Sequence, residues 1–392
     1  MAAVALLWMV SGAGKNAGFD VGAVAAAELA APSLLAPVLG PYVDRWSQRN
    51  LLVGADLARV ATTLTLPFAY KYGGVLPVGL LALIQGTLSV VFSNTGSAVV
   101  PENVTAKDLA PANAWLMTAN HAAAVLGSAL GGILVQFNTM APFAVDALTY
   151  LLSAGLLLTL GLTRRAPPRR VGRSPAGAYW RELRRGVHVA RTRPAVRRLA
   201  RIGGVATVGF APASVAIVVL VRDRLAGSGS DYGAVRAAAA IGLALGAQVG
   251  PWLARRLNSM TRTMSIGYIA MGMLTVGLGL SPNVAYAVPL ALVRSGSNSL
   301  LGVPSNVLLQ QHVPSDVRGR VITLLAALEE TPRLIILPLA GLLVDWIGVR
   351  WVFLAMAAPI IAAGSIAWTA RRVRDGPKLP QLEPDVASDG RT

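Results

Sequence analysis

Long apolar runs recur along nearly the whole chain, and they constrain the fold more than any other feature. Most runs hold about 20 residues, and a helix of that length spans roughly 30 Å of hydrocarbon. Lipid offers no water to backbone N–H and C=O groups, so segments that cross it must be helices or strands of a closed barrel. The runs are too long for strands and lack strict apolar–polar alternation. The sequence therefore predicts an all-α polytopic membrane protein.

Composition supports the same class. The chain is 54% hydrophobic and 14% charged, with a mean hydropathy of +0.57, whereas soluble domains carry about 25% charged residues. We expect twelve helices over residues 2–14, 18–40, 50–70, 73–100, 113–138, 141–162, 199–221, 231–253, 263–281, 283–308, 321–345 and 348–370.

The first run is shorter than the others. Residues 2–14 would span only about 20 Å as a helix, which is less than a bilayer. No basic residue precedes the apolar part and no small-residue cleavage site follows it, so a signal peptide is disfavoured. We interpret the run as a truncated first helix, explained either by a translation start upstream of Met1 or by a defective transporter.

Lysine and arginine predict the orientation. With the N-terminus inside, 26 of them fall in cytoplasmic segments, five fall outside and four lie within helices. Cytoplasmic loops carry this excess in polytopic proteins. We expect both termini in the cytoplasm and a location in the bacterial cytoplasmic membrane.

Several functional classes are disfavoured. The net charge of +17 lies in short gaps between apolar runs, so nucleic acid is not an expected partner. No cysteine and only three histidines occur, which excludes disulfides and thiolate sites and disfavours a metal site. The chain has no G-x-x-x-x-G-K-[ST], G-x-S-x-G or H-E-x-x-H sequence. We therefore expect no enzyme, no cofactor and no ATP-driven step.

A weak internal repeat divides the chain. A shift of 209 residues places Leu130-Gly131-Gly132 on Leu339-Ala340-Gly341, and a shift of 210 places residues 40–45 on 250–255. An even number of helices between copies gives both halves the same orientation. We predict six-helix bundles over 1–163 and 199–372.

The basic stretch 164–198 is predicted to be a cytoplasmic linker, and the tail 373–392 to be disordered, because it is polar and rich in proline. Within the linker, residues 179–189 have a helical pattern. We expect them to lie along anionic headgroups, with a regulatory docking site as the alternative.

A charged turn, Gly40-Pro41-Tyr42-Val43-Asp44-Arg45-Trp46-Ser47-Gln48-Arg49, follows the second run. With the six-plus-six arrangement and the long central loop, it resembles the major facilitator superfamily, although Ser47 stands where the family signature has glycine. Residues 51–59, 100–104 and 313–321 resemble the drug:proton antiporter branch, which includes macrolide efflux proteins and enterobactin exporters. The resemblance covers residues 1–372. It implies a major-facilitator-type twelve-helix bundle whose halves rock around a midplane site.

The resemblance also implies that Gly40, Asp44, Arg45 and Arg49 control the cytoplasmic gate. A carboxylate there can meet a helix N-terminus or a basic side chain in one state and separate from it in the other. The second copy carries Ala254 in place of the acid, so a latch there has lost its carboxylate. Charge that only sets topology is the alternative.

The fifth run contains a second partial signature. Residues 123–132 resemble the antiporter motif G-x-x-x-G-P-x-x-G-G, with Ala123 and Ser128 replacing a glycine and the proline. Gly127, Gly131 and Gly132 would let neighbouring helices approach closely as the bundle rocks. Ordinary helix packing is the alternative.

Ionisable residues inside the apolar runs are functional candidates because they are costly to bury. The repeat register matches His121 with Glu330. The resemblance to the family implies that helices two, five, eight and eleven border a central cavity. The carboxylates suit proton coupling, whereas an ion pair between Glu330 and Arg333 would be purely structural. The candidates are Glu28, His121, Arg294, Glu329, Glu330 and Arg333.

Four further charged residues lie in or beside the apolar runs. Asp56 and Arg59 are spaced to form a structural pair on one helix face near the cytoplasmic rim. Asp146 and Arg236 lie toward the outer side and could belong to an outer gate.

We predict a secondary active transporter that exports an amphipathic small molecule, such as a drug, antibiotic or siderophore, using the proton gradient. Its expected partners are that substrate, protons and the lipid bilayer, with no obligate protein partner. A solute importer of the same fold and a transport-inactive membrane sensor are the alternatives.

Overall fold

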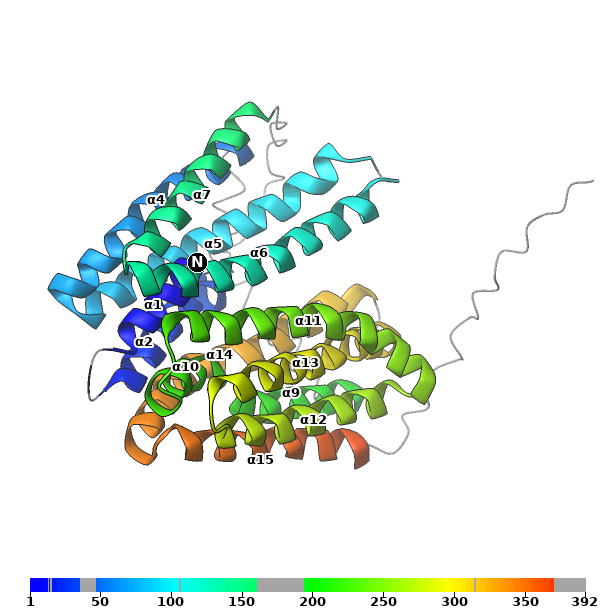
Figure 1. Cartoon of the computed structure of the whole chain (residues 1–392). Coiled ribbons are helices and arrows are strands. Elements are labelled where there is room, and N and C mark those ends of the chain that lie inside the picture. The colour runs from blue at the N-terminus through cyan, green and yellow to red at the C-terminus, as the bar shows by residue number, and fades with distance from the viewer. Residues whose placement is uncertain are drawn as a thin grey trace, which may run out of the picture.

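The computed structural model describes residues 1–12, 14, 16–35, 47–105, 107–160, 194–313 and 315–369. These residues contain helices and no β-strand, which confirms the predicted all-α class (Figure 1). The gate residues Gly40, Asp44 and Arg45, most of the predicted linker and the tail lie outside this part of the chain.

Twelve helical segments follow one another in the described residues, close to the predicted spans. They are α1 (Ala2–Val10), α2 (Ala17–Ala30) with the π-helix η1 (Ala31–Leu35), α4 (Gln48–Gly73), α5 (Val75–Asn103), α6 (Leu109–Phe137), α7 (Ala141–Thr159), α9 (Pro194–Phe210) with α10 (Ala213–Val219) and the π-helix η2 (Leu220–Arg224), α11 (Gly229–Leu257), α12 (Met260–Leu280), α13 (Val284–His312), α14 (Ser315–Ile347) and α15 (Val349–Thr369).

Eight helices of the described residues are long and apolar enough to cross a membrane. They are Gln48–Gly73, Val75–Asn103, Pro111–Phe137, Ala141–Thr159, Val196–Arg224, Gly229–Leu257, Met260–Leu280 and Val349–Thr369.

Local sequence signals explain where several helices begin and end. At the start of α11, Ser228 and Asp231 form a capping box that satisfies free backbone N–H groups. Asn258, with a φ of 48°, ends α11 in the left-handed conformation that asparagine tolerates. Ser259 then caps α12. The predicted end of this helix at residue 253 was therefore four residues too early.

The seventh helix also differs from its prediction. It begins at Pro194, so residues 194–198 are helical although they were assigned to the linker. It is also interrupted at Ala211 and Pro212. Proline lacks the backbone N–H that a continuous helix requires, so the chain turns there before α10 starts.

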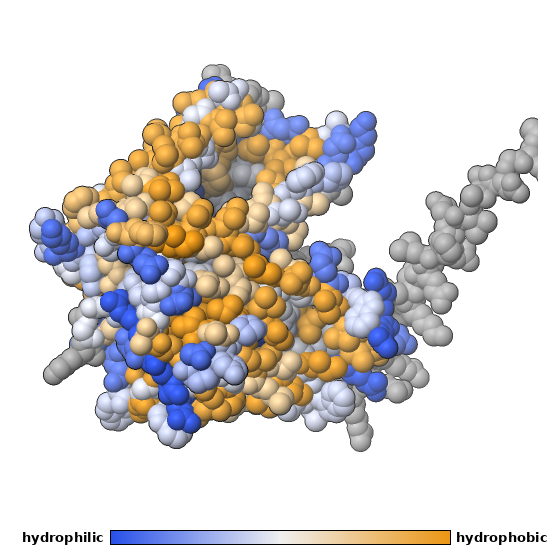
Figure 2. Space-filling model, viewed as in Figure 1, coloured by the Kyte–Doolittle hydropathy of each residue, from blue (hydrophilic) through white to orange (hydrophobic). Residues whose placement is uncertain are grey.

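The helices form an N-terminal half (α1–α7) and a C-terminal half (α9–α15), which diverge toward one end of the molecule (Figure 1). We call this the open end; it carries the α5–α6 and α11–α12 turns. The opposite end, which we call the closed end, carries the α4–α5 turn and the start of α13. Figure 2 shows a notch between the halves at the open end and a largely apolar surface, as expected for helices that face lipid.

Glycines bring the halves together toward the closed end. A Cβ atom on Gly22 of α2 would lie 2.3 Å from the Leu337 carbonyl oxygen of α14, and one on Gly341 would lie 2.1 Å from the Gly18 carbonyl oxygen. Real Cβ atoms do not approach so closely, so only glycine permits this backbone contact. By contrast, residues 113–124 of α6, toward the open end, are exposed on every face.

Candidate functional site

A cavity of about 540 Å³ lies at the seam between the halves. Its walls come from α2 and α5 of the N-terminal half and from α14 of the C-terminal half. Ala25, Leu29, Val90 and Leu337 provide apolar surface, while Gly86 keeps α5 close to the Glu28 carbonyl of α2. A mostly apolar wall with few polar groups is typical of small-molecule sites. Its polar and charged lining residues are Glu28, Ser89, Ser93, Asn94 and Arg333.

Glu28 is the free acid of this cavity. Its side chain is exposed although the residue lies in the middle of α2, because it opens into the cavity. Among the described residues it makes no hydrogen bond or ion pair, although Arg236 on α11 attracts it electrostatically. A membrane helix thus presents one accessible carboxylate with no fixed partner.

Glu330 and Arg333 form the ion pair that their spacing predicted. Arg333 Nη1 lies 2.8 Å from each oxygen of the Glu330 carboxylate. The pair largely neutralises the guanidinium on the cavity wall, although Arg333 Nε has no partner among the described residues. The structure therefore brings Glu28 and Arg333 to one cavity from positions 305 residues apart.

Polar residues of α5 were not among the predicted site residues. Ser89 and Ser93 line the cavity, and Gln85 lies one turn before them. Residues four apart share one face of a helix, so Gln85, Ser89 and Ser93 form a polar stripe on an apolar helix. That spacing is visible in the sequence and could have identified the helix as a cavity wall.

Of the four helices expected to border a central cavity, two line this one. They are helices two and eleven (α2 and α14), and helix four (α5) joins them. His121 is exposed on α6 and does not line the cavity.

Glu329 and Arg294 lie in the C-terminal half away from the cavity. Glu329 Oε1 lies 2.7 Å from where a Cβ of Gly203 on α9 would be. Arg294 is 8% exposed, and its Nε donates to Thr275 Oγ1 of α12 at 2.8 Å. Its Nη2 has no partner among the described residues. Neither residue joins Glu28 in this structure.

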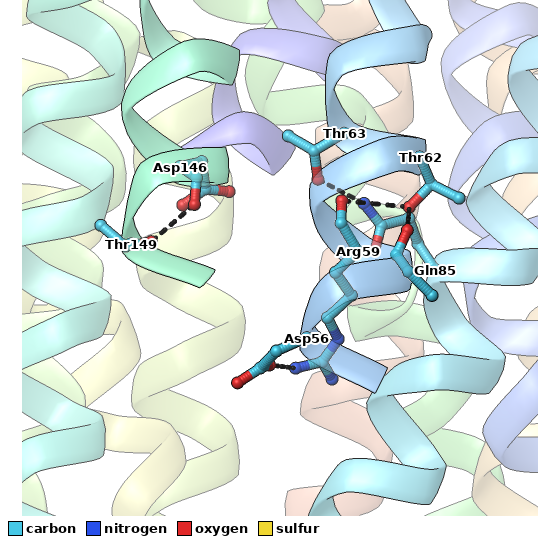
Figure 3. Close-up of polar contacts among 8 residues, drawn as sticks. Asp56, Arg59, Thr62, Thr63, Gln85, Asp146 and Thr149 are labelled. Carbon is cyan, nitrogen blue, oxygen red and sulfur yellow. Dashed lines mark hydrogen bonds and ion pairs between the residues drawn. The ribbon is translucent and has the colours of Figure 1, made fainter. Parts of the chain in front are cut away.

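A buried polar layer adjoins the cavity in the N-terminal half (Figure 3). Asp56 and Arg59 form the predicted pair, with Arg59 Nη1 3.4 Å from Asp56 Oδ1, and both residues are buried. The Arg59 guanidinium lies 4.9 Å from the Phe92 ring centre and 5.3 Å from that of Tyr150. Such cation–π contacts help to hold the charge inside the helix bundle.

A second cavity of about 180 Å³ connects this layer to Glu28. Glu28, Gln85 and Tyr150 all line it, and Gln85 Nε2 donates to Thr63 Oγ1 at 2.6 Å. Asp146 also lines it and accepts from the Ala2 N–H at 3.1 Å. Asp146 thus contacts α1, and among the described residues no hydrogen bond or ion pair joins it to Arg236.

The glycines of α6 take different neighbours. A Cβ on Gly132 would lie 2.5 Å from the Gly233 Cα of α11, so these two glycines form a close crossing between the halves. Gly127 and Gly131 instead face Met1. The tight packing expected of this stretch occurs at Gly132, against the other half, and at Gly131, where a Cβ would lie 2.9 Å from the Met1 carbonyl oxygen.

Of the predicted gate residues, the structure describes Arg49. Its Nη2 donates to the Leu158 carbonyl oxygen at the end of α7, within the same half. In the second copy Ala254 is buried, and the Arg256 guanidinium lies 5.2 Å from the centre of the Trp252 ring. Arg255, the counterpart of Arg45, follows an alanine where Arg45 follows an acid.

Comparisons with known proteins agree with this architecture. The "Multidrug efflux pump Tap" of Mycolicibacterium fortuitum is 26% identical over 358 residues, covering 88% of this chain and 85% of that protein. The "Uncharacterized MFS-type transporter YfiS" of Bacillus subtilis (strain 168) is 20% identical over 349 residues, covering 87% and 82%.

Solved structures share the fold. A bacterial homologue of the iron transporter ferroportin in its inward-facing state superposes with a TM-score of 0.70 at 16% identity, covering 94% of this chain and 96% of that one. A D-xylose–proton symporter gives 0.71 at 15% identity, covering 96% and 94%. In the described residues, no three His, Asp or Glu side chains gather as metal ligands would.

The family profile described as Major Facilitator Superfamily matches residues 1–335. Together with the twelve helices in two halves and the cavity at their seam, this match establishes that the chain belongs to the major facilitator superfamily of membrane transporters.

Proposed function

We propose that the protein exports amphipathic small molecules in exchange for protons. The observation that carries the proposal is the unpaired Glu28 carboxylate in a cavity whose other walls are mostly apolar. Apolar surface would hold the body of an amphipathic molecule, and the carboxylate would hold a basic group. The similarity to proteins named multidrug efflux pump supports export and the breadth of this substrate class.

Glu28 is the group best placed to couple proton entry to substrate export. When ionised, it attracts a cationic substrate; when protonated, it is neutral and costs less to carry through the closed state. Glu330 is less suited, because Arg333 already neutralises it. Competition between one proton and one cationic group for Glu28 would link their fluxes in opposite directions.

The two cavities extend this picture. Glu28 lines both of them, so a proton on Glu28 has a polar route toward Gln85, Tyr150 and the buried Asp56–Arg59 pair. The halves diverge at the open end, which carries the predicted cytoplasmic loops. The proposed cycle therefore loads substrate from the cytoplasm in this conformation and releases it after the halves rock.

The test is accumulation of a fluorescent cationic dye in cells that express the protein. Expression should lower dye accumulation, and a proton ionophore should abolish the difference. Glu28→Gln should remove gradient-driven efflux, while Asp108→Asn, a matched loss of an exposed carboxylate at the start of α6, should retain it. Full efflux by Glu28→Gln would refute the coupling role of this residue.

The same cells distinguish the other readings of the sequence. Uptake of a labelled solute with no dye efflux would identify an importer. Absence of any gradient-dependent flux from purified protein in proteoliposomes would identify a transport-inactive member of the family.

A further inference from the structure

Two electrostatic contacts of opposite sign join the halves at the closed end. Asp345 lies in the last turn of α14, and its Oδ1 accepts from the Gly18 N–H at 2.8 Å. Its Oδ2 accepts from the Phe19 N–H at 2.9 Å. The first N–H groups of a helix have no partner inside the helix and carry partial positive charge. A carboxylate of the C-terminal half thus caps α2 of the N-terminal half.

Arg222 makes the complementary contact on α1. Its Nη1 donates to the Trp8 carbonyl oxygen at 2.6 Å and lies 3.2 Å from Ser11 Oγ. The last carbonyl groups of a helix are unpaired and carry partial negative charge. A cation of the C-terminal half thus caps the end of α1, which belongs to the N-terminal half.

Packing fixes both contacts in place. The Arg222 guanidinium lies 4.9 Å from the centre of the Trp8 ring, and a Cβ on Gly12 would lie 2.5 Å from Arg222 Nη2. Trp8 also stacks on the buried Tyr232 of α11 at 6.0 Å between ring centres. Beside Asp345, a Cβ on Gly18 would lie 2.7 Å from Asp345 Oδ1. The two glycines leave room for the charged groups to reach the backbone.

We propose that Asp345 and Arg222 form a latch that holds the closed end shut and releases when the halves rock. This closed-end latch rests on the proposed alternating access, because its contacts exist only while the two halves meet at this end. Each contact crosses from the C-terminal to the N-terminal half, so separation breaks both.

The surroundings make the latch reversible. Asp20 and Asp223 lie within electrostatic range of Asp345 and repel it. Asp345 is also exposed, so water replaces its partners when the contact opens. We therefore expect each contact to shift the balance between closed and open by about tenfold, which corresponds to about 1.4 kcal/mol.

The absence of cysteine from the chain makes a direct test possible. Ser89→Cys places a single thiol in the cavity wall, behind the latch as seen from the closed end. A membrane-impermeant thiol reagent applied on the closed-end side reports how often that end opens, and the readout requires neither substrate nor transport. Vesicles of both orientations identify that side.

Asp345→Asn and Arg222→Gln should each accelerate labelling of this thiol about tenfold. Two matched controls should leave the rate unchanged. Asp231→Asn removes a carboxylate that caps its own helix, α11, at the same end, and Arg224→Gln removes an exposed arginine two residues from Arg222.

Unchanged labelling in both latch variants, with monodisperse protein, would overturn the proposal. Failure of both variants to assemble would also overturn it, because the latch is proposed to shift a conformational balance and not to support folding. If only one variant fails to assemble, the labelling rate of the other variant tests the latch. Labelling that responds in a protein without efflux would leave the latch standing and remove the proposed export.

Discussion

The crossing of Gly132 with Gly233 gives a sharp prediction for Gly132→Ala. The added Cβ would lie 2.5 Å from the Gly233 Cα and 2.6 Å from the Gly229 carbonyl oxygen. Both atoms are backbone, so no flexible side chain can move away. Normal contacts between carbon atoms are about 3.5–4.0 Å, so α6 and α11 must separate by about 1 Å at this point.

The magnitude follows from the cost of overpacking. Extra methyl groups in well-packed interiors cost about 1–3 kcal/mol. Because the halves are expected to alternate between two states, the protein can relieve the clash by opening this end. A penalty of about 2 kcal/mol on the closed state would change the ratio of states by roughly thirtyfold.

Spin labels on Asn138→Cys and Tyr286→Cys, one at the closed end of each half, would measure this shift. Both side chains are exposed. We expect Gly132→Ala to move the distance distribution to longer values. The control is Gly155→Ala on α7, where a Cβ meets nothing within 4 Å and the alanine should be neutral or slightly stabilising in a helix. An unchanged distribution in Gly132→Ala, at unchanged thermal stability, would refute the view that this crossing sets the closed state.

Two further predictions use residues outside the cavity. Asp44→Asn should reduce the rate of dye efflux, while Ala254→Asp should change it less, because the second copy of the motif carries no acid that a latch could use. Equal effects in the efflux assay would contradict the asymmetry. Arg294→Met should leave the melting temperature unchanged or raise it, since it removes a buried charge that has no acidic partner among the described residues. A clear drop in the melting temperature, measured by thermal denaturation in detergent, would show that the Thr275 contact outweighs the cost of burying the charge.

The positions of most helices could be predicted from the apolar runs of the sequence. Helix positions agreed within a few residues because each membrane helix satisfies its own backbone hydrogen bonds, so its existence depends on its own sequence. The exceptions have local causes as well: Pro212 divides the seventh helix, and Asn258 extends the eighth by allowing a left-handed end. Ion pairs within one helix, Asp56–Arg59 and Glu330–Arg333, were likewise predictable from spacing.

The site was less predictable. The repeat register put His121 and Glu330 at equivalent positions of the two halves, but His121 does not line the cavity and Glu330 pairs with Arg333. The polar stripe of α5 carried the missing information, since Ser89 and Ser93 share one face. The latch had no signal in the sequence, because Asp345 and Arg222 bind backbone groups that any residue supplies.

The sequence by itself determined that the chain crosses the membrane many times and that a few charged residues lie inside the apolar runs. The tertiary structure decided which of those charges meet. Glu28 and Arg333 share a cavity, and Asp345 reaches the start of α2, only because helices distant in the chain cross where glycines allow their backbones to touch. Helix formation depends on neighbours in the chain, whereas these contacts depend on how two complete halves pack against each other.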